Sequence, residues 1–282
     1  MPVPSVSIVI PTRARADYLD VTLASVMAQA ARAGAEVIVV LDGPDDAADA
    51  VARRHGARVE LLERPSGLNA ARNRGLAAAA GELIAFLDDD VEVAGDWVQA
   101  LLEGVAAAPG YELFGGPIRA RLEGGGPRHC GREPPPITTL DLGSEDREAE
   151  FVWGANMALR RRAWERVGGF DETLSGRGDE EEWERRYRAA GGRVRYIAAA
   201  GVVHRRTPRD ARLRALVRAG YALGRTARRN DRRKGSAPPP LRELRVLAGC
   251  AWHAVRRRCA FGLVMGAHEL GRLRELVAER RA

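Results

Sequence analysis

The sequence predicts an α/β fold with a mostly parallel central sheet flanked by helices, followed by a basic helical extension. Short apolar runs, typical of strands buried on both faces, alternate with helical patterns in the first part of the chain. Several of these runs end in acidic residues. The charge then changes sign, because residues 205–282 carry 21 Arg and Lys but 6 Asp and Glu, a net charge of +15. The total of +7 leaves −8 for the first 204 residues.

Length and composition narrow the class of protein. With 282 residues, 45% of them hydrophobic, the chain can build one sizeable core with an appendage. Cys130, Cys250 and Cys259 are odd in number and lack metal-ligand spacing, which argues against a disulfide framework and fits a reducing compartment. We expect neither a signal peptide nor a transmembrane helix, because the start enters a strand pattern directly and no run of about 18 uncharged apolar residues occurs.

The first strands all end in polar residues. We expect strands at 6–10, 36–41, 59–62 and 82–87, with helices around Leu19 to Val26, at 45–54 and at 68–80. Ligands of open α/β sheets bind beyond the carboxyl ends of the strands. Thr12-Arg13, Asp42 and Asp88–Asp90 would therefore meet at one edge of the sheet and form a pocket with acids and one Arg.

Asp88, Asp89 and Asp90 are the strongest single signal in the sequence. Three adjacent carboxylates repel one another unless a cation lies among them. A hard divalent cation bound through oxygen, bridging the acids to substrate phosphates, is one explanation. A solvated acidic turn after a strand is the other.

The middle of the chain departs from the alternating pattern. A strand is expected at 113–121, and residues 124–150 are rich in Gly, Pro and charge. Because structureless loops of that length are usually functional, we predict a mobile segment over the active site. The chain then returns to the sheet at 151–156. A short helix at 160–167, an acidic helix start at 178 and a strand at 193–197 follow, with His204 just beyond.

The tail contains three helical patterns, at 210–229, 241–255 and 261–277, with a hinge at about 230–240. Basic amphipathic helices are typical of membrane surfaces, and the negative cytoplasmic leaflet attracts arginine. The alternative is a helical cap with solvated arginines. Nucleic-acid binding is disfavoured, because no recognised reading module is present.

The order of short motifs resembles the family 2 glycosyltransferases, which are inverting enzymes of the GT-A fold that use nucleotide-sugars. The resemblance covers about residues 5–206, which we take as the catalytic domain, with 207–282 as the basic helical region. It is carried by Val6-Ser7-Ile8-Val9-Ile10-Pro11-Thr12, Asp42-Gly43, Gly67 to Gly75, Gly81-Glu82, Asp88–Asp90, Gly154 to Ala158, Gly168 to Glu172, Gly178-Asp179-Glu180 and His204.

The resemblance implies a metal site. Asp88 and Asp90 match the family's Asp-x-Asp motif, whose last acid coordinates Mn²⁺ or Mg²⁺, and Asp89 joins the nucleotide-binding acids. His204 matches a His that often completes this site, although a lone His is more often structural. Imidazole suits Mn²⁺ better than Mg²⁺.

The resemblance also implies contacts with the nucleotide-sugar donor. Asp42 matches the acid that binds the base or ribose, although the usual preceding acid is here Leu41, which leaves the base open. Arg72 is a candidate cation near the nucleotide, the alternative being a solvated helix face. Further expected contacts are Pro11, Thr12 and Arg13 with the nucleoside, and Trp153 and Asn156 near the sugar, where Trp153 could equally be a core residue.

The general base is expected at the start of the acidic helix. Glu180 takes this position, and Asp179 is its rival because the family's Glu-Asp pair is reversed here. A carboxylate can accept the proton of the attacking hydroxyl. The alternative is a structural cluster, since acids are favoured in a helix's first turn.

The resemblance therefore implies transfer of a sugar from a nucleoside-diphosphate-sugar to a saccharide or lipid-linked hydroxyl acceptor, in cell-surface polysaccharide or glycolipid synthesis. The expected location is cytoplasmic, at the inner face of the cell membrane if the tail binds lipid. Two rivals are a nucleotidyltransferase, whose Gly-rich, Lys-containing signature is missing from residues 8–20, and a non-catalytic basic membrane- or nucleic-acid-binding protein.

Overall fold

The structure is a computed structural model that describes residues 4–133, 135–174 and 179–279, without the side chain of Asp179. The chain divides into two compact units, each described by itself. The sheet unit contains residues 4–119, 139–174 and 179–204. The helical unit contains residues 120–133, 135–138 and 205–279.

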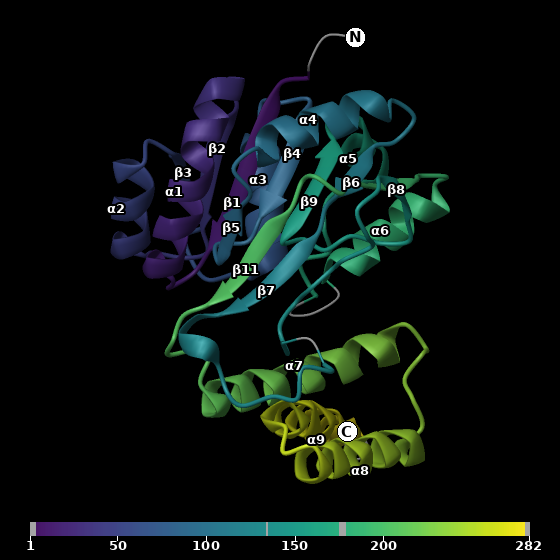
Figure 1. The fold of residues 1–282 in the computed structure, drawn as a ribbon. Coiled ribbons are helices and arrows are strands. Elements are labelled where there is room, and N and C mark those ends of the chain that lie inside the picture. The colour runs from purple at the N-terminus through teal and green to yellow at the C-terminus, as the bar shows by residue number, and fades with distance from the viewer. Residues whose placement is uncertain (1–3, 134, 175–178, 280–282) are drawn as a thin grey trace. The chain divides into compact units, whose positions relative to one another are not determined.

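The sheet unit is built on an eight-stranded sheet of order β3-β2-β1-β4-β9-β6-β10-β8 (Figure 1). The first four strands in this order run parallel, as predicted. Ile8, Val39 and Phe86 are fully buried, as expected for apolar runs covered on both faces. The strands are β1 (Val6–Thr12), β2 (Glu36–Leu41), β3 (Arg58–Leu61), β4 (Leu83–Leu87), β6 (Leu113–Gly115), β8 (Arg147–Ala149), β9 (Asn156–Arg160) and β10 (Val194–Tyr196).

Beyond β4 the sheet becomes mixed, because β9 is antiparallel to both β4 and β6. A second, three-stranded sheet has the order β5-β11-β7, formed by β5 (Val91–Val93), β11 (Val202–Arg206) and β7 (Ile118–Leu122). The sequence analysis placed His204 just beyond the strand at 193–197 and did not predict β11. His204 lies within β11 and pairs with Val91, directly after the acidic cluster.

Helices cover both faces of the large sheet. Helix α1 contacts α2 and α4, whereas α3 packs against β1 and β2. Parallel crossovers are right-handed, so the return from β3 to β4 carries α3 to the face opposite α1. A Cβ on Gly75 in α3 would lie 2.2 Å from Val9 Cγ1, so glycine permits this close packing. The helices are α1 (Ala16–Ala33), α2 (Asp46–Arg54), α3 (Leu68–Ala78), α4 (Trp97–Ala107), α5 (Arg161–Val167) and α6 (Asp179–Ala189).

The middle of the chain differs from expectation in three places. The strand predicted at 113–121 is interrupted at Gly116-Pro117, giving β6 and β7. The return to the sheet begins at Asn156, not at 151. The segment 124–150 is divided, since its part up to 138 belongs to the helical unit and β8 pairs with β10 in the sheet unit. The 3-10 turn η1 (Glu123–Gly125) overlaps the start of this segment.

The helical unit contains α7 (Leu213–Arg233), α8 (Pro240–Arg256) and α9 (Ala260–Glu279), drawn in green to yellow in Figure 1. Helix α9 packs against both α7 and α8. Helix α7 continues into the predicted hinge, so residues 234–239 alone separate it from α8. Within the described residues, no helix combines the length and apolar character that a membrane crossing requires.

Arg228 and Arg272 are buried inside the helical unit, which differs in part from the solvated arginines of the helical-cap alternative. Arg228 Nη1 and Arg272 Nε each donate to Glu243 Oε1, at 3.1 Å. Arg272 also reaches Asp231 Oδ2 at 2.8 Å. All but Asp231 are less than 10% exposed, so part of the positive charge of the tail is neutralised inside the unit.

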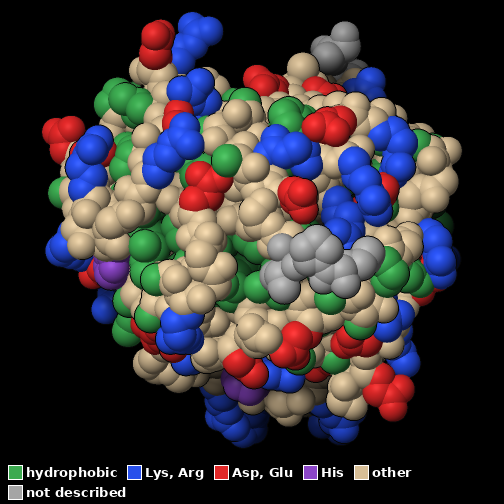
Figure 2. All heavy atoms as spheres, turned by 90° about the horizontal axis from the view of Figure 1, so that it is seen from above, with side chains coloured by type: hydrophobic (Ala, Val, Ile, Leu, Met, Phe, Trp, Pro, Cys, Tyr) green, Lys and Arg blue, Asp and Glu red, His purple; other side chains and the backbone are tan. Residues whose placement is uncertain are grey.

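On the face shown in Figure 2, basic and acidic side chains are interspersed rather than gathered by sign. Ion pairs of the sheet unit likewise join side chains of opposite charge. Arg58 and Arg74 both bind Glu60, at 2.7 and 2.6 Å. Pairs with an exposed partner contribute little individually, about 0–1 kcal/mol, so the stability of the sheet unit rests mainly on its apolar core.

Candidate active site

Asp88, Asp89 and Asp90 follow β4 at the carboxyl edge of the parallel strands. Because β1 and β4 are parallel neighbours, the end of β1 lies beside them, and Thr12 Oγ1 donates to Asp89 Oδ2 at 2.7 Å. The amide of Asp42, at the end of β2, donates to the Thr12 carbonyl at 3.0 Å. The three strand ends therefore meet at one edge.

Arg15, which the sequence analysis did not single out, binds two of these acids. Its Nη1 lies 2.8 Å from Asp89 Oδ1, and its Nη2 lies 2.6 Å from Asp90 Oδ2. The preceding Ala14 has φ 53°, in the left-handed region that non-glycine residues rarely adopt. This turn between β1 and α1 gives Arg15 a position that no local sequence pattern indicates.

Asp90 and His204 form a buried pair, with 3.1 Å between Asp90 Oδ1 and His204 Nε2. Two ligands at adjacent corners of an octahedral metal site would lie about 3 Å apart, given bonds of about 2.1 Å. A carboxylate and an imidazole suit a cation such as Mn²⁺. The donor set and its spacing therefore fit a divalent cation held by Asp90 and His204.

The acids influence one another's protonation. The pKa of Asp88 is raised, chiefly by burial and then by the charge of Asp90, while Arg72 and His204 lower it and Glu180 raises it. Burial raises the pKa of Asp89 to about 7, against the opposing effect of Arg15. The predicted metal, nucleotide and base positions thus lie close enough to Asp88 to act on it electrostatically.

A pocket of about 320 Å³ opens beside Asp88 and Asp89, within the range of small-molecule sites. Asp42 lies in its wall, where its carboxylate accepts hydrogen bonds from the Gly67 amide at 3.0 and 3.1 Å, at the N-terminus of α3. Arg13 Nη1 lies 3.8 Å from Asp42 Oδ2. The residues lining the pocket are Pro11, Thr12, Arg13, Arg15, Asp42, Gly67, Leu68, Ala71, Asp88 and Asp89.

Arg72 is 2% exposed, which excludes the solvated helix face that we considered for it. Its guanidinium lies against the backbone of Gly154, where a Cβ would come within 2.1 Å of Arg72 Nη2. The Gly154 amide donates to Glu180 Oε1 at 3.3 Å. Glu180, in the first turn of α6, is itself buried, so the loop at Gly154 links the candidate cation to the candidate base.

Glu184, one turn after Glu180, is a further acid that sequence reasoning missed. It is 1% exposed and accepts a hydrogen bond from the Val152 amide at 3.1 Å. Burial raises its pKa to about 8, and the charge of Glu180 adds to this rise while the Val152 hydrogen bond opposes it. Its spacing of four residues from Glu180 was the available signal.

The two residues expected near the sugar lie in different environments. Trp153 is half-buried, with its ring 4.9 Å from that of Phe151. Asn156 is buried, accepts from Trp97 Nε1 at 3.0 Å and donates to the Ala200 carbonyl at 2.8 Å. Because its amide is engaged within the protein, we do not include Asn156 among the proposed sugar contacts. The side chain of Asp179 lies outside the described residues.

Solved structures of glycosyltransferases share this fold. The Pyrobaculum calidifontis mannosyltransferase PcManGT, in complex with GDP-Man and Mn²⁺, aligns with a TM-score of 0.58 at 18% identity, covering all of this chain and 76% of that one. GalNAc-T7 with UDP, GalNAc and Mn²⁺ aligns with a TM-score of 0.54 at 18% identity, over 72% and 43% of the two chains. The architecture is that of the GT-A glycosyltransferases, as predicted.

The family model for glycosyl transferase family 2 matches residues 7–168, and the chain belongs to that family. A pre-mycofactocin glycosyltransferase of Mycobacterium tuberculosis is 34% identical over 210 residues, which cover 71% of this chain and 42% of that protein. A glucosyl-dolichyl phosphate glucuronosyltransferase of Haloferax volcanii is 25% identical, covering 71% and 69%. The chain thus spans less than half the length of the mycobacterial relative.

Proposed function

We propose that this protein is a metal-dependent, inverting glycosyltransferase that moves a sugar from a nucleoside-diphosphate-sugar to a hydroxyl acceptor. The observation that carries the proposal is the buried Asp90–His204 pair beside the pocket, within electrostatic reach of Arg72 and Glu180 through Asp88. Membership of family 2 supports the same reaction and disfavours a nucleotidyltransferase. The acceptor we propose is a saccharide or a lipid-linked sugar of cell-surface polysaccharide or glycolipid synthesis.

Asp90 and His204 would hold Mn²⁺ or Mg²⁺. When bound, the cation would offset negative charge on the nucleoside-diphosphate leaving group. Arg15 binds both Asp89 and Asp90. A guanidinium binds phosphate as readily as carboxylate, so Arg15 would be able to bind a donor phosphate in place of one of these acids.

The nucleoside would occupy the pocket of about 320 Å³. Pro11, Thr12 and Arg13 line it beside Asp42, whose carboxylate is oriented by the amides at the start of α3. An acid fixed in this way is suited to accept hydrogen bonds from a base or from ribose hydroxyls.

Glu180 would act as the general base. It would accept the proton of the acceptor hydroxyl as that oxygen attacks the anomeric carbon on the side opposite the leaving group. The Gly154 amide donates to its Oε1 at 3.3 Å, which helps to orient the carboxylate. Asp179 remains the alternative, and Trp153 is the proposed stacking surface for a sugar.

The helical unit would bring the enzyme to the inner face of the cell membrane. The apolar stripe of α8 is exposed, with Trp252 69% and Val255 78% accessible. Exposed arginines flank it, at positions 242, 245, 256 and 257. An exposed apolar stripe bordered by arginine is typical of helices that lie in the surface of an anionic membrane. The full stripe is Leu241, Leu244, Ala248, Trp252 and Val255.

A thermal-shift panel of UDP, GDP, dTDP and CDP, each with and without Mn²⁺, tests the proposal. A ligand at a hundredfold excess over its dissociation constant stabilises the folded state by about 2.7 kcal/mol. We expect a metal-dependent shift with one of the four that is lost in Asp90→Ala. Release of that nucleoside diphosphate from its sugar conjugate then tests the chemistry. Failure of all four to shift the unfolding temperature would count against a donor site.

A further inference from the structure

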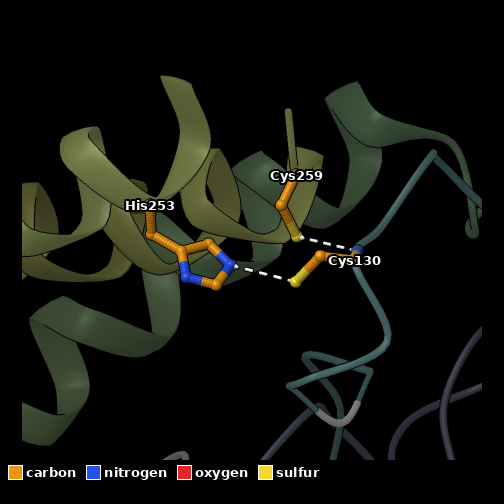
Figure 3. Close-up of side chains that lie close together, drawn as sticks. All are labelled: Cys130, His253 and Cys259. Carbon is orange, nitrogen blue, oxygen red and sulfur yellow. Dashed lines mark hydrogen bonds between the residues drawn. The ribbon is translucent and has the colours of Figure 1, made fainter. Parts of the chain in front are cut away.

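Cys130, His253 and Cys259 lie together in the helical unit, although their spacing in the sequence gives no sign of it (Figure 3). One sulfur or ring-nitrogen atom from each lies within 4.8 Å of the others. Cys130 comes from the segment after β7, His253 from the last turn of α8, and Cys259 from the turn between α8 and α9. The cluster is formed by residues far apart in the chain, so the sequence spacing of the cysteines did not predict it.

The distances suit a tetrahedral site. Cys130 Sγ lies 3.4 Å from His253 Nε2. Thiolate and imidazole ligands of one Zn²⁺ would lie roughly 3.6 Å apart, given bonds of about 2.3 and 2.05 Å. The Cys130 amide points at Cys259 Sγ, 3.4 Å away, as a hydrogen-bond donor that favours a thiolate there.

The backbone around the cluster is constrained. Arg258, directly before Cys259, has φ 47°, a left-handed conformation that costs an arginine energy. The Ala260 amide donates to the Arg128 carbonyl at 2.9 Å, and the rings of His129 and Phe261 stack at 4.8 Å. These contacts hold the segment of Cys130 against the α8–α9 turn on both sides of the sulfur atoms.

The charge of the surroundings suits two thiolates. Arg256, Arg257 and Arg258 precede Cys259 in the sequence and are exposed. Two thiolates would neutralise a divalent cation, so its binding adds no net charge to this basic region.

We propose that Cys130, His253 and Cys259 bind Zn²⁺, in a site separate from the Mn²⁺ or Mg²⁺ position of the candidate active site. Sulfur and imidazole ligands select a borderline-soft cation, whereas Mg²⁺ requires oxygen. Three protein ligands leave a fourth position for water. The ion ties the segment of Cys130 to the α8–α9 turn, and its binding releases the thiol protons.

The test uses the untagged chain of 282 residues, reduced, loaded with Zn²⁺ and dialysed. We expect about one Zn²⁺ per chain by elemental analysis. Replacement by Co²⁺ is expected to give a thiolate-to-cobalt charge-transfer band and the intense visible bands of a tetrahedral site. Mn²⁺ and Mg²⁺ are not expected to displace either ion. These readouts do not depend on sugar transfer, so failure of the zinc proposal can be distinguished from failure of the proposed function.

The chain supplies its own control in Cys250, a buried thiol of α8 outside the cluster. Cys250→Ser is expected to keep full Zn²⁺ binding. Cys130→Ser, Cys259→Ser and His253→Gln are each expected to weaken binding at least a hundredfold. Cys130 is only half-buried, so circular dichroism of Cys130→Ser is expected to match that of the parent chain.

Three results would overturn the proposal. They are a reduced parent chain that takes up no Zn²⁺, a Cys130→Ser variant that binds it as tightly as the parent, and a quantitative Cys130–Cys259 disulfide whose reduction yields no metal binding. The last result would identify the pair as a redox couple.

Discussion

At the scale of single residues, Asp90 divides its carboxylate between two partners. One oxygen faces His204 at 3.1 Å and the other faces Arg15 at 2.6 Å. A metal ion at Asp90 must therefore compete with Arg15, while a donor diphosphate would gain from it. We therefore expect Arg15 to weaken the binding of the metal ion and to strengthen the binding of the diphosphate.

Arg15→Gln is predicted to raise the affinity for Mn²⁺ alone by roughly tenfold, because loss of a charged hydrogen bond of about 1.5 kcal/mol frees Asp90. It is predicted to weaken nucleoside diphosphate binding in saturating Mn²⁺ by a similar factor. Isothermal titration calorimetry measures both affinities. Arg32→Gln, which removes an exposed side chain at the opposite end of α1, is the matched control. A change of the same sign for both ligands would refute the exchange role of Arg15.

Glu180→Gln is predicted to lower turnover by about 10²- to 10⁴-fold, the usual contribution of a general base. Donor affinity is expected to stay within a few-fold, because Gln can still accept from the Gly154 amide. Asp179→Asn made in parallel distinguishes the two candidates. A large loss of turnover confined to the Asp179 variant would transfer the role to that residue.

Glu184 gives the sheet unit a pH dependence whose sign can be derived. Its pKa is raised from 4.5 to about 8, so the folded state keeps a proton that the unfolded chain loses above 4.5. Its contribution therefore lowers the free energy of unfolding as the pH rises from about 4.5 to about 8, at most by about 1.4 kcal/mol per pH unit for one proton.

Glu184→Gln is predicted to flatten that slope and to stabilise the protein above neutral pH, since its oxygen still accepts from Val152. Urea unfolding across the pH range measures the slope. The groups that act on Glu184 besides Val152 are Glu180, Arg188 and Arg72, and the variant leaves all of them in place. Glu182→Gln, on the same helix, serves as the control, and an unchanged slope in Glu184→Gln would contradict the argument.

At the scale of elements, the helical unit depends on close backbone contact between α7 and α9. A Cβ on Gly224 would lie 1.9 Å from the His268 carbonyl oxygen, and one on Gly271 would lie 2.1 Å from that of Tyr221. Backbone atoms cannot move aside as a flexible side chain can. The two helices must separate if either glycine is enlarged.

Gly224→Ala is predicted to destabilise the helical unit by about 1–3 kcal/mol, as overpacking usually does. Gly249→Ala, in α8, has no atom within 4 Å of the new methyl group and is predicted to stabilise by up to about 1 kcal/mol through helix propensity. Chemical denaturation compares the two. Equal effects of the two substitutions would show that close packing of α7 on α9 does not limit the stability of the helical unit.

How much the sequence revealed differs between elements. The strand before Asp88 was predictable because five buried apolar residues precede three acids. The apolar run indicates a buried strand, and the acids mark the point where it ends. Strand β11 was missed because the segment from Val202 to Arg206 is short and mixes apolar with charged residues. Arg15 and the Cys130 cluster were missed for a different reason. Their geometry depends on the turns at Ala14 and Arg258 and on contacts between residues far apart in the chain, which no local pattern encodes.

At the scale of the whole molecule, the proposed membrane contact combines apolar and charged terms. Arginine near an anionic surface contributes about 1 kcal/mol each, and this term weakens as the Debye length shrinks from about 10 Å at 0.1 M salt to about 3 Å at 1 M. The apolar term of Trp252 and its neighbours does not depend on screening in this way.

Flotation with phosphatidylserine-containing vesicles is predicted to recover the protein, with recovery falling as salt rises. Leu244→Ser combined with Trp252→Ser is expected to abolish flotation without loss of fold, since both side chains are exposed. Leu61→Ser, an exposed leucine of β3 that is 49% accessible, is the control and is expected to float normally. Flotation of the double variant equal to that of the parent would exclude α8 as the contact.

The long separation between Cys130 and Cys259 also has a consequence during synthesis. The two residues are 129 positions apart, so at about 5–20 residues per second Cys130 leaves the ribosome roughly 6 to 26 s before its partner exists. His204 likewise follows the acids after β4 by more than a hundred positions. Throughout that interval the nascent chain carries an unshielded thiol and an incomplete acidic cluster. The state of the thiol depends on the reducing power of the compartment in which translation takes place, and that of the acidic cluster depends on the free metal there.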